Sequence, residues 1–202
     1  MRNSIITLAI TIFLLAAELC NVAYACTGFT DVPDGFWAEG EIAEVSKLGF
    51  MTGTEPEVFE PETILTRAQI IQILWRVDGC PESDLKAGFR DVDSNAWYFE
   101  ALCWGYQHGI SLGFEYLLRP DVPITREELA TILYRHSEEE YKVPGRVEIP
   151  QEVSAWATIP FEWAAASNIM APTDPQSFVS RADMAVVLCD YWRFLNERES
   201  RL

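Results

Sequence analysis

The stretch Thr66-Arg67-Ala68-Gln69 decides the fold of this chain, because it recurs twice in a related form. Each copy has a hydroxyl residue, an arginine, a variable position and a side chain that accepts a hydrogen bond, followed by an apolar helical pattern. The arginines stand 59 and 55 residues apart in a chain of 202 residues. A motif repeated at such a period indicates an array of similar structural units. The other two copies are Thr125-Arg126-Glu127-Glu128 and Ser180-Arg181-Ala182-Asp183.

The ends of the motif predict the start of a helix. A hydroxyl followed three residues later by Gln, Glu or Asp is typical of a capping box, in which each side chain bonds the other residue's backbone N–H. Beyond each motif, apolar residues recur at i, i+3, i+4 and i+7, which predicts one buried helical face. We expect His136, which ends the second stripe, to be a hydrogen-bonded structural histidine. The stripes are Ile70, Ile73, Leu74 and Val77; Leu129, Ile132, Leu133 and His136; and Met184, Val187, Leu188 and Tyr191.

Another helix is expected upstream of each motif. A repeated tryptophan precedes an amphipathic stretch, and twelve residues after that tryptophan stands a glycine or an asparagine. These two residue types favour the left-handed conformation that follows a helix C-terminus. The tryptophans are Trp37, Trp97 and Trp156, the terminating residues are Gly49, Gly109 and Asn168, and the predicted helices cover about residues 38–48, 98–108 and 159–167.

These patterns predict a mainly α protein built from three tandem helix-loop-helix repeats. A single helical hairpin of this length cannot bury an apolar face alone, whereas three can bury their faces against one another. We expect the repeats to cover residues 26–87, 88–146 and 147–202. The third is divergent, because Pro150 stands where the first two repeats have Asp31 and Asp91, six residues before the tryptophan.

Residues 1–25 have the pattern of a cleaved secretory signal peptide. Arg2 precedes an apolar run from Ile5 to Ala17 that is shorter than the roughly 20 residues of a membrane span. The segment Ala23-Tyr24-Ala25 fits signal peptidase. We therefore expect a secreted protein of the cell surface with no transmembrane span after cleavage. Because cleavage would leave Cys26 first, a lipid-anchored cysteine is the rival interpretation.

Charge and composition limit the partners of this chain. Its formal charge of −16 repels nucleic acid and anionic membranes. Only two histidines are present and no Cys-x-x-Cys spacing occurs, so neither a metal site nor a cofactor is expected. An even number of cysteines after residue 25 permits two disulfides in any of three pairings, although buried cysteines with at most one bridge are the favoured interpretation. These cysteines are Cys26, Cys80, Cys103 and Cys189.

The arginine of the repeated motif is not explained by helix capping. In the first position of a helix, a cation faces the positive end of the helix dipole, which costs a few tenths to about 1 kcal/mol. Free N–H groups at a helix N-terminus favour anions, and a guanidinium can bind a carboxylate through two parallel hydrogen bonds. Arg67, Arg126 and Arg181 therefore indicate three sites for an acidic ligand. The repeated tryptophans suit stacking on a sugar ring and equally suit core packing, and the repeated aspartates also suit turn capping.

The order of these signals resembles the S-layer homology (SLH) domain. In the first two copies, Phe-x-Asp-Val is followed by Trp, by the predicted helix and by Gly. A second Gly, then Phe-x-Pro or Leu-x-Pro, and finally Leu-Thr-Arg or Ile-Thr-Arg complete the order. The third copy is recognised by its spacing, by Trp156 and by Ser180-Arg181-Ala182-Asp183. The resemblance implies a pseudo-threefold assembly with a central bundle of the second helices and with ligand grooves between repeats.

The resemblance also implies a function and a set of site residues. Modules of this family bind secondary cell-wall polysaccharide without catalysis, commonly through pyruvate ketals. By position, Arg67, Arg126 and Arg181 become carboxylate ligands. Pro150, Pro172 and Asn168 depart from the pattern, which places the groove of the third repeat in question. The remaining implied groove residues are Asp31, Asp91, Trp37, Trp97, Trp156, Gly53 and Gly113.

Two other functions compete with wall binding. A secreted glycan hydrolase would use a pair of carboxylates, but no acidic pair stands apart from the repeat pattern. A structural surface-layer component with decayed glycan grooves would join other surface-layer proteins through apolar faces. For that role Trp104, Trp163, Trp75 and Trp192 are candidates, although core packing is the favoured interpretation of all four.

Overall fold

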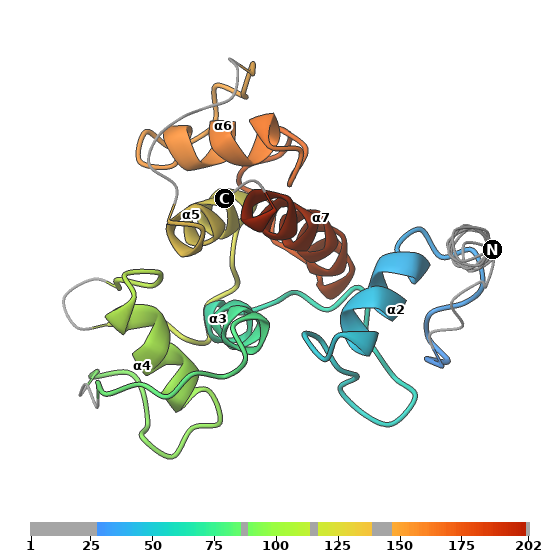
Figure 1. Cartoon of the computed structure of the whole chain (residues 1–202), viewed down its shortest axis with the longest axis horizontal. Helices are drawn as coiled ribbons and strands as arrows, with labels where there is room; N and C mark the ends of the chain where they lie inside the picture. The colour runs from blue at the N-terminus through green and yellow to red at the C-terminus, as the bar shows by residue number, and fades with distance from the viewer. Residues whose placement is uncertain (1–27, 86–88, 114–116, 139–146, 201–202) are drawn as a thin grey trace, which may run out of the picture.

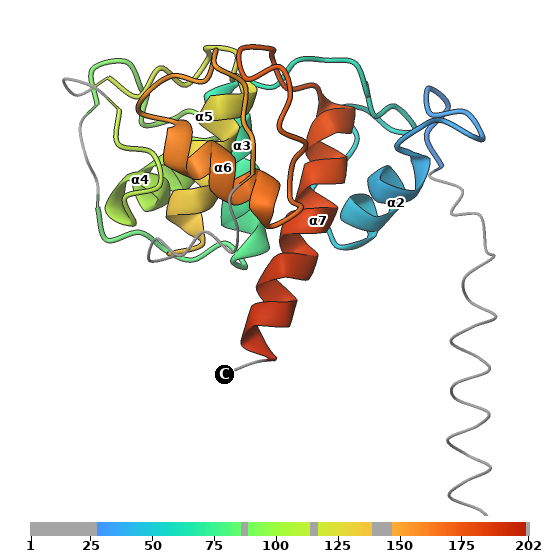
Figure 2. The same ribbon diagram turned by 90° about the horizontal axis from the view of Figure 1, so that it is seen from above.

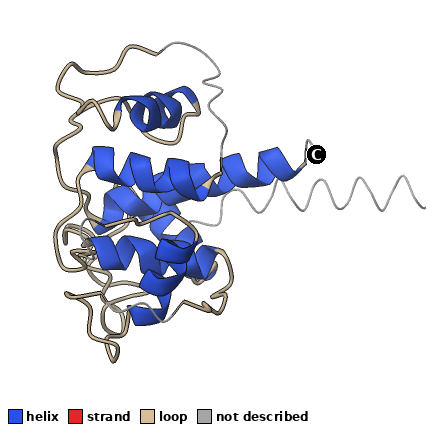
Figure 3. Cartoon of the chain, turned by 90° about the vertical axis from the view of Figure 1, so that its left-hand side faces the viewer, coloured by secondary structure: helices blue, strands red, loops and turns tan. Residues whose placement is uncertain are grey.

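The computed structural model describes residues 28–85, 89–113, 117–138 and 147–200. The predicted signal peptide and Cys26 lie outside the described residues. Within them the protein consists of helices joined by loops, with only isolated β-bridges between extended segments (Figure 3). The helices are α2 (Glu39–Lys47), α3 (Arg67–Val77), α4 (Phe99–Gln107), α5 (Arg126–His136), α6 (Thr158–Ala166) and α7 (Arg181–Glu199).

Three helices form the centre of the molecule and three lie around them. The helices that follow the repeated motif, α3, α5 and α7, come together in the middle, and α2, α4 and α6 lie outside (Figure 1). The fold class is therefore confirmed as mainly α, with a central bundle of the second helices. The C-terminal end of α7 differs from those of α3 and α5, because α7 continues past the other helices (Figure 2).

The outer helices do not pack against the central helix of their own repeat. Instead, α4 packs on α3, α6 packs on α5, and α2 packs on α7. Each outer helix thus covers the central helix of the preceding unit, and the first outer helix closes the circle on the last central one. The hairpin expected within each repeat is therefore not the packing unit, because the apolar face of each outer helix is buried by a neighbouring repeat.

A closed ring of backbone hydrogen bonds joins the three units just before the central helices. The N–H of Leu65 donates to the carbonyl of Val179 at 2.9 Å, that of Ile124 to Leu65 at 3.1 Å, and that of Val179 to Ile124 at 3.1 Å. All three residues are buried. Since buried backbone groups must be paired, this ring fixes the pseudo-threefold axis.

The capping boxes are confirmed in all three central helices. Thr66, Thr125 and Ser180 each accept from the N–H of the third helical residue, whose side chain in turn accepts from the capping residue's N–H. The first backbone N–H groups of these helices are also hydrogen-bonded. Those of Arg67, Arg126 and Arg181 donate to carbonyl groups of the next unit at 3.0 Å, and those of the following residues do so at 2.8–3.0 Å. The expectation of free N–H groups at these helix starts is therefore wrong.

The predicted core is confirmed and is wider than the predicted stripes. Beside the stripe residues, Ile71, Ala130 and Ala185 are buried as well, because each central helix has neighbours on several sides. Trp104 and Trp163 are core residues, each with 2% of its surface exposed. The left-handed helix ends are confirmed at their predicted positions, with φ angles of +75° at Gly49, +71° at Gly109 and +55° at Asn168.

The structure also shows the surroundings of His136 and of three cysteines. The two ring nitrogens of His136 lie 2.6 Å from the Tyr191 hydroxyl and 3.2 Å from an Asp78 carboxylate oxygen, so this histidine is a hydrogen-bonded structural residue. No disulfide joins Cys80, Cys103 or Cys189 to one another; Cys103 and Cys189 are buried as expected, whereas the expectation of a buried side chain is wrong for Cys80, which is exposed. None of the helices in the described part of the chain is long and apolar enough to cross a bilayer.

The capping hydroxyl is expected to act on stability. Replacing Thr66 with alanine removes the acceptor for the Gln69 N–H and should lower the free energy of unfolding by about 0.5–2 kcal/mol. Thr66→Ser keeps that acceptor and is the matched control. Denaturant unfolding monitored by circular dichroism measures both, and an equal loss in the two variants would contradict the capping role.

Candidate ligand-binding grooves

Three surface grooves lie between the repeats and share one plan. Each contains the arginine that begins one central helix, the loop after the next outer helix, and the exposed side of the central helix that follows that loop. We name the grooves by their arginines, as the Arg67, Arg126 and Arg181 grooves. Because residues from different repeats form each groove, the grooves exist only in the assembled fold.

The Arg181 groove joins the third repeat to the first. Arg181 is buried, and its guanidinium donates from Nε to the Phe59 carbonyl at 2.6 Å and from one Nη to the Thr52 carbonyl at 2.7 Å. The guanidinium also lies over the Phe59 ring, 4.4 Å from its centroid, a cation–π contact. Further lining residues are Met51, Gly53, Leu65, Gln69, Gln72, Ile73, Arg76 and Trp97.

Two arginines therefore share the Arg181 groove, and none of the residues that line it is acidic. Burial lowers the pKa of Arg181, Glu60 and Asp31 nearby raise it, and the positive charge of Arg76 lowers it again. The guanidinium remains a cation, since arginine does not lose its proton in proteins. The volume of this groove, about 130 Å³, is room for a small substituent rather than for a whole oligosaccharide.

The Arg67 groove joins the first repeat to the second and has an internal ion pair. Arg67 Nη2 donates to Glu128 Oε1 at 2.6 Å, whereas Arg126 and Arg181 donate to backbone carbonyls. Arg135 lies in the same groove, where burial lowers its pKa and the charge of Arg67 lowers it further. Ile110, Ser111, Leu112, Gly113, Leu117, Leu118, Arg119 and Ile132 complete the described lining.

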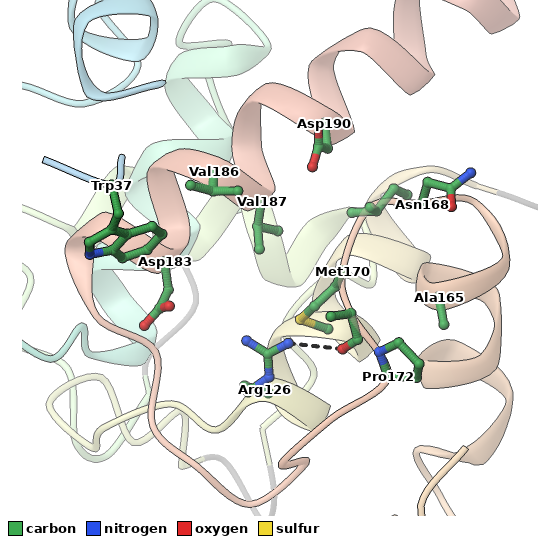
Figure 4. Close-up of a pocket in the computed structure, with 12 residues that line it drawn as sticks. Trp37, Arg126, Ala165, Asn168, Met170, Pro172, Asp183, Val186, Val187 and Asp190 are labelled. Atoms are coloured by element: carbon green, nitrogen blue, oxygen red, sulfur yellow. Dashed lines mark hydrogen bonds between the residues drawn. The ribbon is translucent and has the colours of Figure 1, made fainter. Parts of the chain in front are cut away.

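The Arg126 groove joins the second repeat to the third and has an acidic wall. Arg126 donates from Nε to the Thr173 carbonyl at 3.0 Å and from Nη2 to the Ala171 carbonyl at 2.9 Å (Figure 4). Asp183 and Asp190, both from α7, project into the same groove. Burial lowers the pKa of Arg126, and the charge of Asp183 acts to raise it. The lining also includes Pro172 and Asn168, two of the residues at which the third repeat departs from the pattern.

The three repeated tryptophans are surface residues. Trp37, Trp97 and Trp156 are 58%, 63% and 57% exposed, which excludes core packing. Trp97 lines the Arg181 groove and Trp37 lines the Arg126 groove, each coming from the repeat after the one that supplies the loop. Trp156 is not among the described residues that line the Arg67 groove. The role of all three as ligand contacts stays a prediction.

The two repeated aspartates hold the loops of the grooves in place. Asp31 accepts from the N–H groups of Phe59 and Glu60 at 2.9 and 2.6 Å, and Asp91 accepts from Leu118 and Arg119 at 3.0 and 2.7 Å. Burial acts to raise the pKa of Asp31, but these backbone hydrogen bonds outweigh it and the pKa lies below its usual value. Phe59 is the residue whose carbonyl accepts from Arg181, so Asp31 positions that acceptor.

Gly53 and Gly113 lie in the groove walls at places where a side chain does not fit. A Cβ at Gly53 would stand 2.7 Å from the carbonyl oxygens of Glu55 and Val58. At Gly113 it would stand 2.4 Å from the Leu117 carbonyl, and φ there is +63°. Both glycines permit the tight loop that follows the outer helix; a direct ligand contact by either stays a prediction.

Sequence reasoning missed the residues at the tenth position of each central helix. These residues, Arg76, Arg135 and Asp190, stand nine residues after the motif arginine and face the grooves. The repeat spacing alone would have found them. It also missed Glu127, a buried carboxylate that accepts from the N–H and hydroxyl of Ser154 at 2.9 and 2.8 Å and fastens the start of the third repeat.

These features define a class of protein: a tandem array of helical repeats closed around a threefold pseudo-axis, with surface grooves between units. The family model of the S-layer homology domain matches residues 28–71 and 88–130. The first two repeats of the chain belong to this family. Its third unit lies outside the matched residues, yet α6 and α7 repeat the same arrangement of outer and central helix.

Known proteins of two kinds are similar to this chain. The chain is 26% identical over 189 residues to the exoglucanase XynX of Acetivibrio thermocellus, and this match covers 87% of the chain and 17% of that protein. It is 28% identical over 144 residues to the S-layer protein of Bacillus thuringiensis subsp. finitimus, and 27% identical over 144 residues to the S-layer protein sap of Bacillus anthracis. Each of the latter matches covers 71% of the chain and 18% of the relative. The chain thus spans less than a fifth of the length of these relatives.

The motif arginines should differ in their effect on stability. Arg181→Ala leaves two carbonyl acceptors of the first repeat without their charged donor and should lower the free energy of unfolding by about 2–4 kcal/mol. Arg67→Ala removes a partly exposed ion pair and should cost about 0–1 kcal/mol. Urea unfolding of both variants tests the contrast, and equal losses would contradict the separate roles of these arginines.

The groove glycines should be intolerant of a side chain. Gly53→Ala forces the loop carbonyls apart and should lower the free energy of unfolding by about 1–3 kcal/mol. Gly40→Ala, in α2, meets open space and should raise it by about 0.5–1 kcal/mol, because alanine favours the helix. Thermal unfolding of the two variants should therefore shift in opposite directions.

Proposed function

We propose that this chain is a noncatalytic module that attaches at the cell surface to an acidic cell-wall polysaccharide. S-layer homology domains are anchoring modules of cell-surface proteins, and S-layer proteins are among the relatives of this chain. The relatives named as enzymes match it over only a small part of their length. The proposal goes further and assigns recognition of the acidic group, a pyruvate ketal, to the grooves between repeats.

The observation that carries this proposal is the composition of the Arg181 groove. Two guanidinium groups, from Arg181 and Arg76, line a small groove beside an exposed indole, Trp97, and no carboxylate among its lining residues neutralises them. A carboxylate can bind such a pair through charge-assisted hydrogen bonds. An adjacent aromatic face suits the apolar face of a sugar ring. A ketal carboxylate on a hexose supplies both partners at once.

The positive charge of the Arg181 groove is opposite in sign to the net charge of the protein. With a formal charge of −16, the protein repels anions at long range. The backbone carbonyls of Thr52 and Phe59 hold the Arg181 guanidinium in a fixed position, so little conformational entropy is lost when a ligand binds. Binding should therefore depend on short-range contacts and should weaken as salt screens them.

Sedimentation with purified cell walls tests the proposed function. The protein should pellet with walls, and the bound fraction should fall strongly after mild acid removes ketal pyruvate from the polymer. Trp97→Ala and Arg76→Ala should each weaken binding about tenfold or more, because each deletes a groove contact worth more than about 1 kcal/mol.

Arg90→Ala is the matched control for Arg76→Ala, since Arg90 is an exposed arginine that lines none of the three grooves. It should bind walls as the unchanged protein does. Undiminished binding to walls without pyruvate would contradict recognition of the acidic group. A wall-glycan cleaving activity of the purified protein would contradict the noncatalytic assignment.

A further inference from the structure

Two positions of each central helix line its groove or contact the groove arginine, and they differ among the repeats. The third helical residue is Gln69 in α3, Glu128 in α5 and Asp183 in α7. The tenth residue is Arg76, Arg135 and Asp190, in the same order. Together with the arginine contributed by the neighbouring repeat, these positions contribute charged or neutral side chains that differ from groove to groove.

The charged side chains therefore differ from one groove to the next. The Arg181 groove has two arginines and a neutral amide at these positions. The Arg67 groove has three arginines, Arg67, Arg119 and Arg135, and Arg67 is already paired with the carboxylate of Glu128. The Arg126 groove has one arginine and two carboxylates.

We propose that these two positions determine which groove takes an acidic sugar: the Arg181 groove binds it tightly, the Arg67 groove binds it weakly, and the Arg126 groove excludes it. This inference rests on the proposed function. It assigns specificity to side chains outside the repeated arginine, and it makes the three grooves unequal despite their shared plan.

The hydrogen bonds of the third helical residue explain the difference between the two basic grooves. Glu128 divides its oxygens, with Oε2 accepting from the Thr125 N–H at 3.0 Å and Oε1 accepting from Arg67 at 2.6 Å. Oε1 thus competes with the carboxylate of a ligand for Arg67. A ligand meets an arginine whose charge an internal carboxylate already neutralises.

Gln69 cannot act in that way. Its single acceptor, Oε1, is used by the Thr66 N–H at 2.8 Å, so its remaining polar group is the amide nitrogen, which is a donor. A donor cannot neutralise Arg181, but it can donate to a bound carboxylate. The same capping box therefore leaves a competing acceptor in one groove and an additional donor in the other.

The Arg126 groove is acidic at both positions. Asp183 Oδ2 accepts from the Ser180 N–H and hydroxyl at 3.0 and 2.6 Å, and its charge acts on Arg126. Asp190 accepts from Arg193 at 2.6 Å and projects toward the groove (Figure 4). A carboxylate ligand would meet two like charges here, which disfavours it.

Exchange of the third helical residues tests the proposal. The probe is the methyl glycoside of a 4,6-O-pyruvylated hexose, titrated calorimetrically, and the indole N–H signal of Trp97 in a ¹⁵N spectrum reports occupation of the Arg181 groove. Glu128→Gln should tighten the weaker site about tenfold, and Gln69→Glu should weaken the tighter one about tenfold. Each substitution recreates the capping side chain of the sister helix, so both variants retain the cap.

Asp183→Asn is the matched control, because it removes a third-position carboxylate while Asp190 remains in its groove. It should leave both affinities unchanged. If Asp183→Asn tightens binding as Glu128→Gln does, the net charge of the protein is responsible and the inference is wrong. Unchanged affinities in all three variants would also overturn it, while leaving the proposed function intact.

Two further outcomes separate this inference from the proposed function. If the unchanged protein sediments with walls in a pyruvate-dependent way but all three grooves bind the probe equally, the ranking fails and wall binding stands. If neither the probe nor the wall polymer binds to any variant, the proposed function fails and the ranking fails with it.

Discussion

The ring of three hydrogen bonds among Leu65, Ile124 and Val179 is the constraint on which the remaining structure depends. Each residue donates to one neighbouring repeat and accepts from the other, so the three segments that precede the central helices must meet at one point. The helix starts are then fixed relative to the loop of the next repeat, whose carbonyls accept their first N–H groups. The grooves follow directly, because the same loops form their walls.

The motif arginines have two kinds of surroundings within this frame. Arg126 and Arg181 reach across a repeat boundary to backbone carbonyls, and in doing so they connect neighbouring units. Arg67 instead reaches a carboxylate. A clean division of the motif into a structural cap and a functional arginine is therefore too simple. A guanidinium has five donors, and two of them suffice for the structural bonds of Arg181.

Local features of the fold could be predicted from the sequence, and non-local ones could not. Capping boxes and left-handed helix ends depend on residues close in the chain, so Thr66 and Gly49 indicated the helix boundaries correctly. The partner of an outer helix depends on residues distant in the chain, and for α2 that partner is α7, more than a hundred positions away. Apolar periodicity shows that a face is buried, but it does not show which helix buries it.

The same limit applies to the candidate site. The arginines were visible because a cation at the start of a helix is unusual, and Arg76 was overlooked because a charged residue late in a helix has an ordinary place on a solvated face. The exposure of Trp97 was equally hidden, since a repeated tryptophan suits a core and a surface alike. Pro172 and Asn168 did indicate a different third groove, although its acidic residues come from α7.

The contact between α2 and α7 has a consequence for how the molecule acquires its structure. A ribosome delivers the N-terminus first, so the apolar side of α2, with Ile42 and Val45, emerges long before its partner has been made. The first repeat therefore cannot complete its packing before the third repeat has been synthesised. Closing such a long loop is entropically costly and slow compared with local pairing, and the packing of α2 is complete only when α7 has been synthesised.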